Sequence, residues 1–119
     1  METEKDIDTI ESMLCDAVES GYLNYWAEVR NIKQDKQTRS YVSFEVRDHG
    51  DGGERQSDTW VLINHAIIRK AVKKILAGEI EISRTIAAQF VGKEYDWNYD
   101  AEGVDCVVQV ATFNEIIFG

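Results

Sequence analysis

Apolar residues recur at helical spacing in three stretches of the chain, and this pattern predicts amphipathic α-helices. The helices are expected over residues 6–19, over residues 64–77 and from Asp100 onward. Asn64 and Asp100 stand at the starts of the second and third helices, where such side chains favour an N-cap. A fourth, shorter helix is expected over residues 83–92.

Alternating apolar and polar residues predict three β-strands. These strands are expected over residues 23–32, 40–48 and 58–63. The second is the clearest, because Val42, Phe44 and Val46 alternate with polar residues and are expected to face inward. A glycine-rich turn at residues 49–56 would join the last two strands, so the three form an antiparallel meander.

Together these elements predict a single compact α+β domain over residues 1–119. Three to four helices are expected to cover one face of a small antiparallel sheet of about three strands. The chain has 119 residues, of which 44% are hydrophobic, and this is enough for one core of that kind.

The last twenty residues, DAEGVDCVVQVATFNEIIFG, predict a capped helix, a tight turn and a final apolar strand. The run CVVQVATF is rich in β-branched residues, so a strand is the alternative to a helix there. The apolar ending at residues 116–119 is expected to fold against the rest of the domain. On that expectation the sequence is a complete chain rather than a fragment.

The charge of the chain is acidic, with a net value of −9 at pH 7. This balance disfavours nonspecific attraction to nucleic acids and anionic membranes, so direct nucleic-acid binding is not expected. No apolar run is long enough for a transmembrane helix, and the acidic N-terminus is unlike a signal peptide. Cys15 and Cys106 are therefore expected as reduced thiols in a cytoplasmic protein.

The motifs of metal and cofactor chemistry are weak. Asp96, Asn98 and Asp100 have the alternation of an EF-hand loop, but Ala101 and Val107 replace the glycine and glutamate that such a loop requires. His49 and His65 lack further ligands at zinc-binding spacing. We therefore predict no metal and no cofactor, and no catalytic residue is assigned.

Positive charge is concentrated in one place. Residues 64–78 contain four bases, Arg69, Lys70, Lys73 and Lys74, and no acid. This helix face is either a solvated surface or an anion site for a nucleotide phosphate or an acidic partner.

Aromatic residues give the stronger indication of binding. Tyr25 and Trp26 stand at a helix–strand junction, and Trp97 and Tyr99 precede the last helix. Large rings in polar segments either cap the core or stack on a ligand or partner. As ligand-binding candidates we take these four, with Arg30 and Arg47 on neighbouring predicted strands as their polar partners.

Two segments resemble an uncharacterised family of small proteins from bacteriophages and prophages. The first is AVESGYLNYWAEV, residues 17–29, with Ser20 and Gly21 where the family has two glycines before its Tyr-Trp pair. The second is the C-terminal segment, in which Asn114 replaces the family's turn glycine. Its matching residues are Asp100, Ala101, Asp105, Gln109, Phe113, Glu115 and Gly119.

The resemblance implies an accessory protein of a mobile element, acting in the cytoplasm of a bacterial host. Small acidic phage proteins of this kind often antagonise host defence, by sequestering an anionic, nucleotide-like signal or by binding a defence protein. An acidic DNA mimic that inhibits a nucleic-acid-binding enzyme is the first alternative, and a nucleotide hydrolase is the second. A homo-oligomer is expected, because a small protein forms a deep pocket most easily between subunits.

Overall fold

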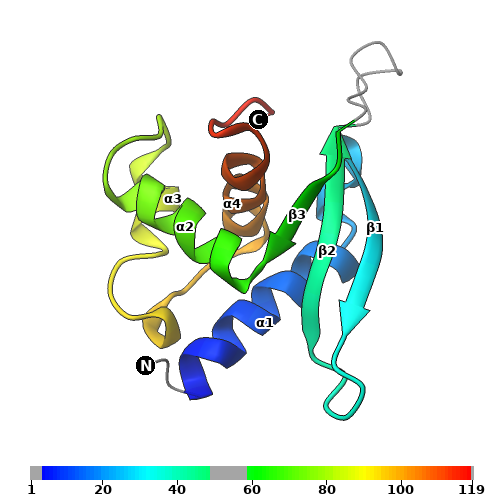
Figure 1. Ribbon diagram of the computed structural model, residues 1–119. Coiled ribbons are helices and arrows are strands. Elements are labelled where there is room, and N and C mark those ends of the chain that lie inside the picture. Colours follow the sequence, from blue (N-terminus) through cyan, green and yellow to red (C-terminus); the bar gives the residue numbers. More distant parts are fainter. Residues whose placement is uncertain (1–3, 49–58, 119) are drawn as a thin grey trace.

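The computed structural model describes residues 4–48 and 59–118, with the backbone alone described at 4–8. These residues form one α+β domain with four α-helices and a three-stranded sheet (Figure 1). The helices are α1 (Glu4–Glu19), α2 (His65–Leu76), α3 (Arg84–Ala88) and α4 (Ala101–Phe113). The strands are β1 (Ala27–Gln34), β2 (Tyr41–Asp48) and β3 (Val61–Asn64). Two 3₁₀ turns are η1 (Tyr22–Tyr25) and η2 (Glu94–Asp96).

The sheet is an antiparallel meander in the order β1-β2-β3, as the alternation predicts. Its register pairs Glu28 with Arg47 and Arg30 with Glu45 across β1 and β2. The pairing becomes irregular after Arg30, where Asn31 has a positive φ of 51°. Such an irregularity bends the edge strand and makes it a poorer template for pairing with another chain.

Side-chain caps fix the starts of three helices, each at the residue that the sequence indicates. Asn64 Oδ1 accepts a hydrogen bond from the Ile67 amide at 3.0 Å, and Ser83 Oγ accepts one from the Ile86 amide at 3.2 Å. Asp100 Oδ1 accepts one from the Gly103 amide at 2.8 Å. The run CVVQVATF is therefore helical, because its N-cap overrides the strand preference of its β-branched residues.

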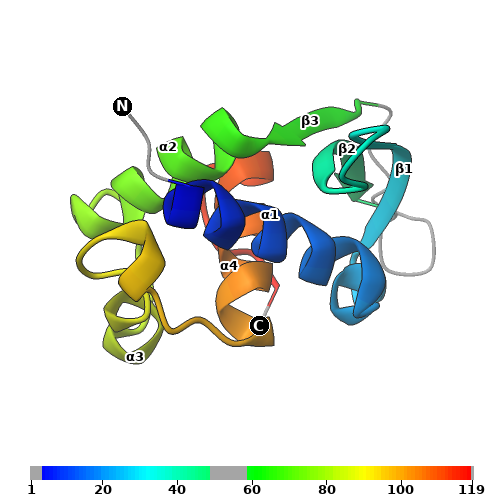
Figure 2. The ribbon, with the colours of Figure 1, turned by 90° about the horizontal axis from the view of Figure 1, so that it is seen from below.

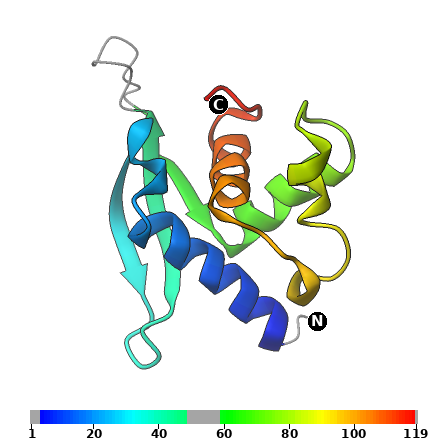
Figure 3. The same ribbon diagram turned by 180° about the vertical axis from the view of Figure 1, so that it is seen from behind.

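Helix α4 lies in the middle of the domain, between the sheet and the pair α2 and α3 (Figure 3). All eight residues from Gly103 to Val110 are buried. A helix that is buried on all sides is expected to be apolar all round, and only Asp105 and Gln109 break that rule here. Helix α1 runs beneath α4 toward the sheet, as seen from below (Figure 2).

The core joins apolar side chains from the four helices and the three strands. Its fully buried members include Leu14 on α1, Phe44 on β2, Ile63 on β3 and Val107 on α4. The outer face of the sheet has no helix over it in the described part of the chain (Figure 1). No helix among the described residues is long and apolar enough to cross a membrane.

Several sequence predictions are wrong. The helix predicted to run to residue 92 ends at Ala88. The strand predicted from residue 23 begins at Ala27, because Gly21, with φ 73°, leads into a 3₁₀ turn that turns Trp26 into the core. Val42 is 45% exposed rather than inward-facing, because it lies near the start of β2, beyond the last residue pair with β3 at Ser43 and Asn64. The predicted final strand does not form, and the backbone of Ile117 and Phe118 is instead hydrogen-bonded to the Gln109 side chain. The predicted turn at 49–56, with His49, lies outside the described residues.

Candidate binding cleft

An open cleft of about 880 Å³ lies beside the first half of α4. Its walls come from η1, from the segment that leads into α3, and from the chain after α4. The lining residues are Tyr22, Tyr25, Glu81, Ile82, Ser83, Ile86, Glu102, Asp105, Cys106, Glu115, Ile116 and Phe118. We call this cavity the acidic cleft, because four of these residues are acids and none is a base.

The acids occupy two levels of the acidic cleft. Glu81, Glu102 and Glu115 are exposed at its rim. Asp105 is only 3% exposed and lies at its floor. Carboxylates that line a concave, partly apolar surface concentrate negative potential there, which attracts cationic groups.

The Asp105 carboxylate accepts hydrogen bonds from three neutral donors. The Tyr25 hydroxyl donates to Oδ2 at 2.5 Å, and the Trp26 indole Nε1 donates to Oδ1 at 2.7 Å. Gln109 Nε2 also donates to Oδ1, at 3.2 Å. No basic side chain of the described residues forms an ion pair with Asp105, so the fold satisfies its hydrogen bonds but leaves its charge uncompensated.

Gln109 ties the chain after α4 to this group. Its side chain is fully buried, and its Oε1 accepts hydrogen bonds from the amides of Ile117 and Phe118 at 2.9 and 2.8 Å. Its Nε2 donates to the Phe118 carbonyl at 3.0 Å. Phe118 then stacks on Trp26, with ring centroids 5.7 Å apart and planes 12° from parallel. One wall of the acidic cleft is thereby fixed to its floor.

The pKa values of three groups that line the acidic cleft are raised, chiefly by burial and further by the acids of the cleft. Burial, then the hydrogen bond to Asp105, raises the pKa of the Tyr25 hydroxyl above its usual value. Burial, followed by the charges of Glu102 and Asp105, also raises the pKa of Tyr22. Burial, and then the charge of Asp105, raises the pKa of the Cys106 thiol to about 11. The thiol is therefore protonated at neutral pH and is a poor nucleophile.

Two of the predicted site residues meet at the acidic cleft. Tyr25 is 51% exposed on its wall, whereas Trp26 is 1% exposed and lies beneath it. Trp26 packs against Phe113 and Phe118, so it contributes to the site through its hydrogen bond to Asp105 rather than through ligand contact.

The other predicted aromatics lie elsewhere. Trp97 packs edge-on against Phe90, with ring centroids 5.4 Å apart, and its buried indole N–H has no acceptor among the described residues. Tyr99 lines a smaller groove between α1 and α4. Among the described residues, the ring of Trp26 contacts Phe113 and Phe118, whereas the ring of Trp97 contacts Phe90. The four aromatic candidates therefore do not form one surface.

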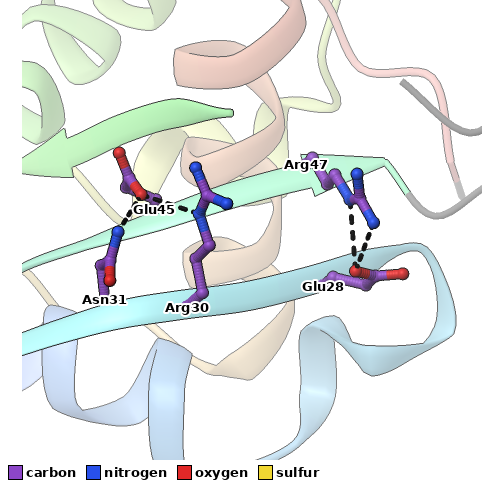
Figure 4. A network of polar contacts seen from close by, with 5 residues as sticks. All are labelled: Glu28, Arg30, Asn31, Glu45 and Arg47. Carbon is purple, nitrogen blue, oxygen red and sulfur yellow. Dashed lines mark hydrogen bonds and ion pairs between the residues drawn. The ribbon is translucent and has the colours of Figure 1, made fainter. Parts of the chain in front are cut away.

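Arg30 and Arg47 share the outer face of the sheet, where each is paired with a carboxylate (Figure 4). Arg30 Nε donates to Glu45 at 2.9 Å, and Arg47 Nη2 donates to Glu28 at 3.0 Å. Both guanidinium groups also lie over the Trp60 ring, at 3.9 and 4.6 Å from its centroid. The sequence pattern did not indicate that Trp60 contacts these arginines, because its position in a predicted strand does not show which side chains of the neighbouring strands lie beside it.

The basic face of α2 is also partly engaged within the chain. Arg69 Nε donates to Glu94 at 2.6 Å, and Lys74 Nζ donates to Asn114 Oδ1 at 2.6 Å. The Arg69 bond joins α2 to the chain before α4, and the Lys74 bond joins α2 to the turn after α4. Two of the four bases of α2, Arg69 and Lys74, therefore form contacts within the chain.

The main site residue that the sequence interpretation did not select is Asp105. One signal was present, since Asp105 and Gln109 are the polar residues of the apolar run GVDCVVQV and stand one helical turn apart. Among the described residues, no three His, Cys, Asp or Glu side chains form a group that could hold a metal ion.

Comparison with known proteins identifies no relative. No protein-family model matches the chain, and no curated protein and no solved structure matches it.

Proposed function

We propose that the protein is a binding protein whose acidic cleft takes a basic segment of a protein partner. The observation that carries this proposal is the uncompensated charge of Asp105 at the floor of an open cavity without a basic lining residue. A guanidinium or ammonium group supplied by a partner would complete that charge pair.

The dimensions of the acidic cleft agree with this occupant. A volume of about 880 Å³ lies within the range of ligand pockets and is large enough for more than one side chain. The exposed phenol rings of Tyr22 and Tyr25 add faces on which a guanidinium can stack. Tyrosine and arginine are also the residue types that dominate binding energy at protein interfaces.

Among the functions expected from the sequence, this site favours binding of a defence protein over sequestration of a nucleotide. Arg30 and Arg47, the residues expected to meet an anion, are already paired with Glu45 and Glu28. The resemblance to phage and prophage proteins supplies the context in which we propose this role: an accessory protein that blocks the basic surface of a host enzyme. The homo-oligomer stays a prediction.

Fluorescence anisotropy with labelled peptides tests the proposal. The probe is a fluorescein-labelled peptide of alternating Arg and Gly, and matched Gln-Gly and Glu-Gly peptides are the controls. We expect the arginine peptide alone to bind, with an affinity that falls as salt is raised. Equal binding of the arginine and glutamine peptides would contradict the proposal.

A pair of double variants places the interaction in the acidic cleft. Glu81→Gln with Glu102→Gln removes two rim charges, and Glu11→Gln with Asp96→Asn removes two charges outside the cleft. Two exposed charge pairs are together worth about 1 kcal/mol, so we expect the first variant to bind roughly fivefold more weakly. The control variant should bind as the wild type does. Equal weakening in both variants would mean that net charge, and not the cleft, attracts the peptide.

A further inference from the structure

A second cavity, of about 240 Å³, lies between α1 and the first turn of α4. Its floor consists of the buried side chains of Ala17, Leu23 and Val104, and the ring of Tyr99 forms part of its wall. We call it the apolar groove. Its exposed rim residues are Asp16, Ser20, Tyr22, Asp100 and Ala101.

The apolar groove and the acidic cleft share one residue. Tyr22 lines both cavities and is 43% exposed. The first turn of α4 also lies between the two cavities, because Ala101 lines the groove and Glu102 lines the cleft. A peptide segment that crosses Tyr22 therefore reaches both cavities.

The charges around the apolar groove match those of the cleft. Asp16 and Asp100 flank the groove, and no base is among its lining residues. Burial is the main cause that raises the pKa of Tyr99 to about 12, and the charge of Asp16 adds to it. An apolar side chain carried on a basic segment fits this arrangement, because the acids would repel an acidic segment.

We propose that the apolar groove is a second subsite, which takes an apolar side chain of the same segment whose basic side chain enters the acidic cleft. This inference rests on the proposed function and adds a sequence requirement to it. The partner segment then carries a basic residue and an apolar residue. Their spacing must span Tyr22 and the first turn of α4, which lie between the two cavities. The basic residue supplies charge pairing, and the apolar residue supplies burial.

Labelled peptides that differ at one position test the requirement. The probes are the Arg-Gly peptide and versions in which one glycine at a time is replaced by leucine. We expect at least one leucine position to tighten binding about tenfold, because burial of one leucine side chain has that effect. Leucines at the other positions should leave the affinity unchanged.

Two matched variants of the protein locate the effect. Ala101→Leu fills the apolar groove from its exposed rim, and Ala66→Leu adds the same side chain at an exposed position of α2 that lines neither cavity. We expect the gain from the peptide leucine to disappear in Ala101→Leu and to persist in Ala66→Leu. Circular dichroism of both variants shows that the fold is retained.

The outcomes separate this inference from the proposed function. If the Arg-Gly peptide binds and leucine adds nothing at any position, the subsite is refuted and the acidic cleft stands. A leucine gain that survives in Ala101→Leu refutes the subsite as well. If no arginine peptide binds the wild type, the proposed function fails and the subsite fails with it.

Discussion

Substitutions of Asp105 can separate two roles of its carboxylate: hydrogen-bond acceptor within the fold, and negative charge that attracts a ligand. In Asp105→Ala, the buried Trp26 indole loses its acceptor, and the buried Gln109 amide loses its bond to Asp105 but keeps its bond to the Phe118 carbonyl. The buried indole N–H without a partner costs about 1–3 kcal/mol and the bond that Gln109 loses about 1 kcal/mol, so the free energy of unfolding should fall by about 3 kcal/mol. Tyr25 adds little to this sum, because its ring is half exposed and its hydroxyl can bind water.

The isosteric substitution Asp105→Asn should behave differently. Its amide oxygen can still accept from Trp26 and Gln109, and its amide nitrogen can donate to the Tyr25 oxygen. Two bonds to a charged acceptor become neutral ones, a loss of about 1 kcal/mol each. Removal of a buried, unpaired charge gains several kcal/mol. We therefore expect stability to match or exceed that of the wild type.

Urea denaturation followed by far-UV circular dichroism measures both free energies, and peptide anisotropy measures binding. We expect Asp105→Asn to fold stably but to bind the Arg-Gly peptide about tenfold more weakly, since a truncated partner of a buried charge pair has at least that effect. If Asp105→Asn is as unstable as Asp105→Ala, the fold itself needs the negative charge. The reasoning that leads from an uncompensated carboxylate to a cationic partner would then be refuted.

Two further predictions concern packing and pH. A Cβ at Gly103 would displace the Gln89 amide from its bond to the Asp100 backbone and lie 3.3 Å from Phe90, so Gly103→Ala should destabilise by about 1 kcal/mol despite its better helix propensity. Urea denaturation should show that cost shrinking in a Gln89→Ala background, and an equal cost there would refute the contact. Because the pKa of Tyr99 is raised to about 12 from 10, its contribution to stability is complete below about pH 10 and lost as pH rises to about 12. Tyr99→Phe should flatten that decline in unfolding free energy, and an unchanged slope would contradict it.

The sequence predicts the helices and the sheet order because their determinants are local. Caps at Asn64, Ser83 and Asp100 depend on side chains within three residues of the amide they accept from. The α+β class, the single domain and the meander follow from the same local patterns and are confirmed.

The errors arise where distant residues decide the conformation. Residues 23–26 belong to the strand predicted over residues 23–32, but Trp26 Nε1 finds its acceptor at Asp105, 79 positions later. The tail at 116–118 is apolar like a strand, yet the Gln109 side chain occupies the hydrogen bonds that a neighbouring strand would have used. The spacing of apolar residues and the strand preference of residue types contain no information about such distant hydrogen-bond partners.

The same reason limits what the sequence shows of the site. The aromatic pattern finds Tyr25 at the acidic cleft, but it cannot separate this exposed ring from the buried Trp26 beside it. It also cannot show that Arg30 and Arg47 are paired with Glu45 and Glu28, since that depends on strand register. Register is fixed by the whole sheet rather than by either strand.

A polar pair in the centre of an otherwise apolar helix is an unfavourable choice for stability alone. Apolar side chains of similar size at 105 and 109 would need no partners, and replacing buried charge by apolar groups often stabilises a protein. Gln109 has a structural reason to be there, because its three bonds of 2.8–3.0 Å hold the backbone of the tail. Asp105 has no such contact with the tail, and a neutral acceptor could also satisfy the Trp26 indole, at a cost of about 1 kcal/mol in bond strength. Departures from local consistency concentrate at functional sites, so the buried negative charge of Asp105 supports the proposal that a cationic group of a partner enters the acidic cleft.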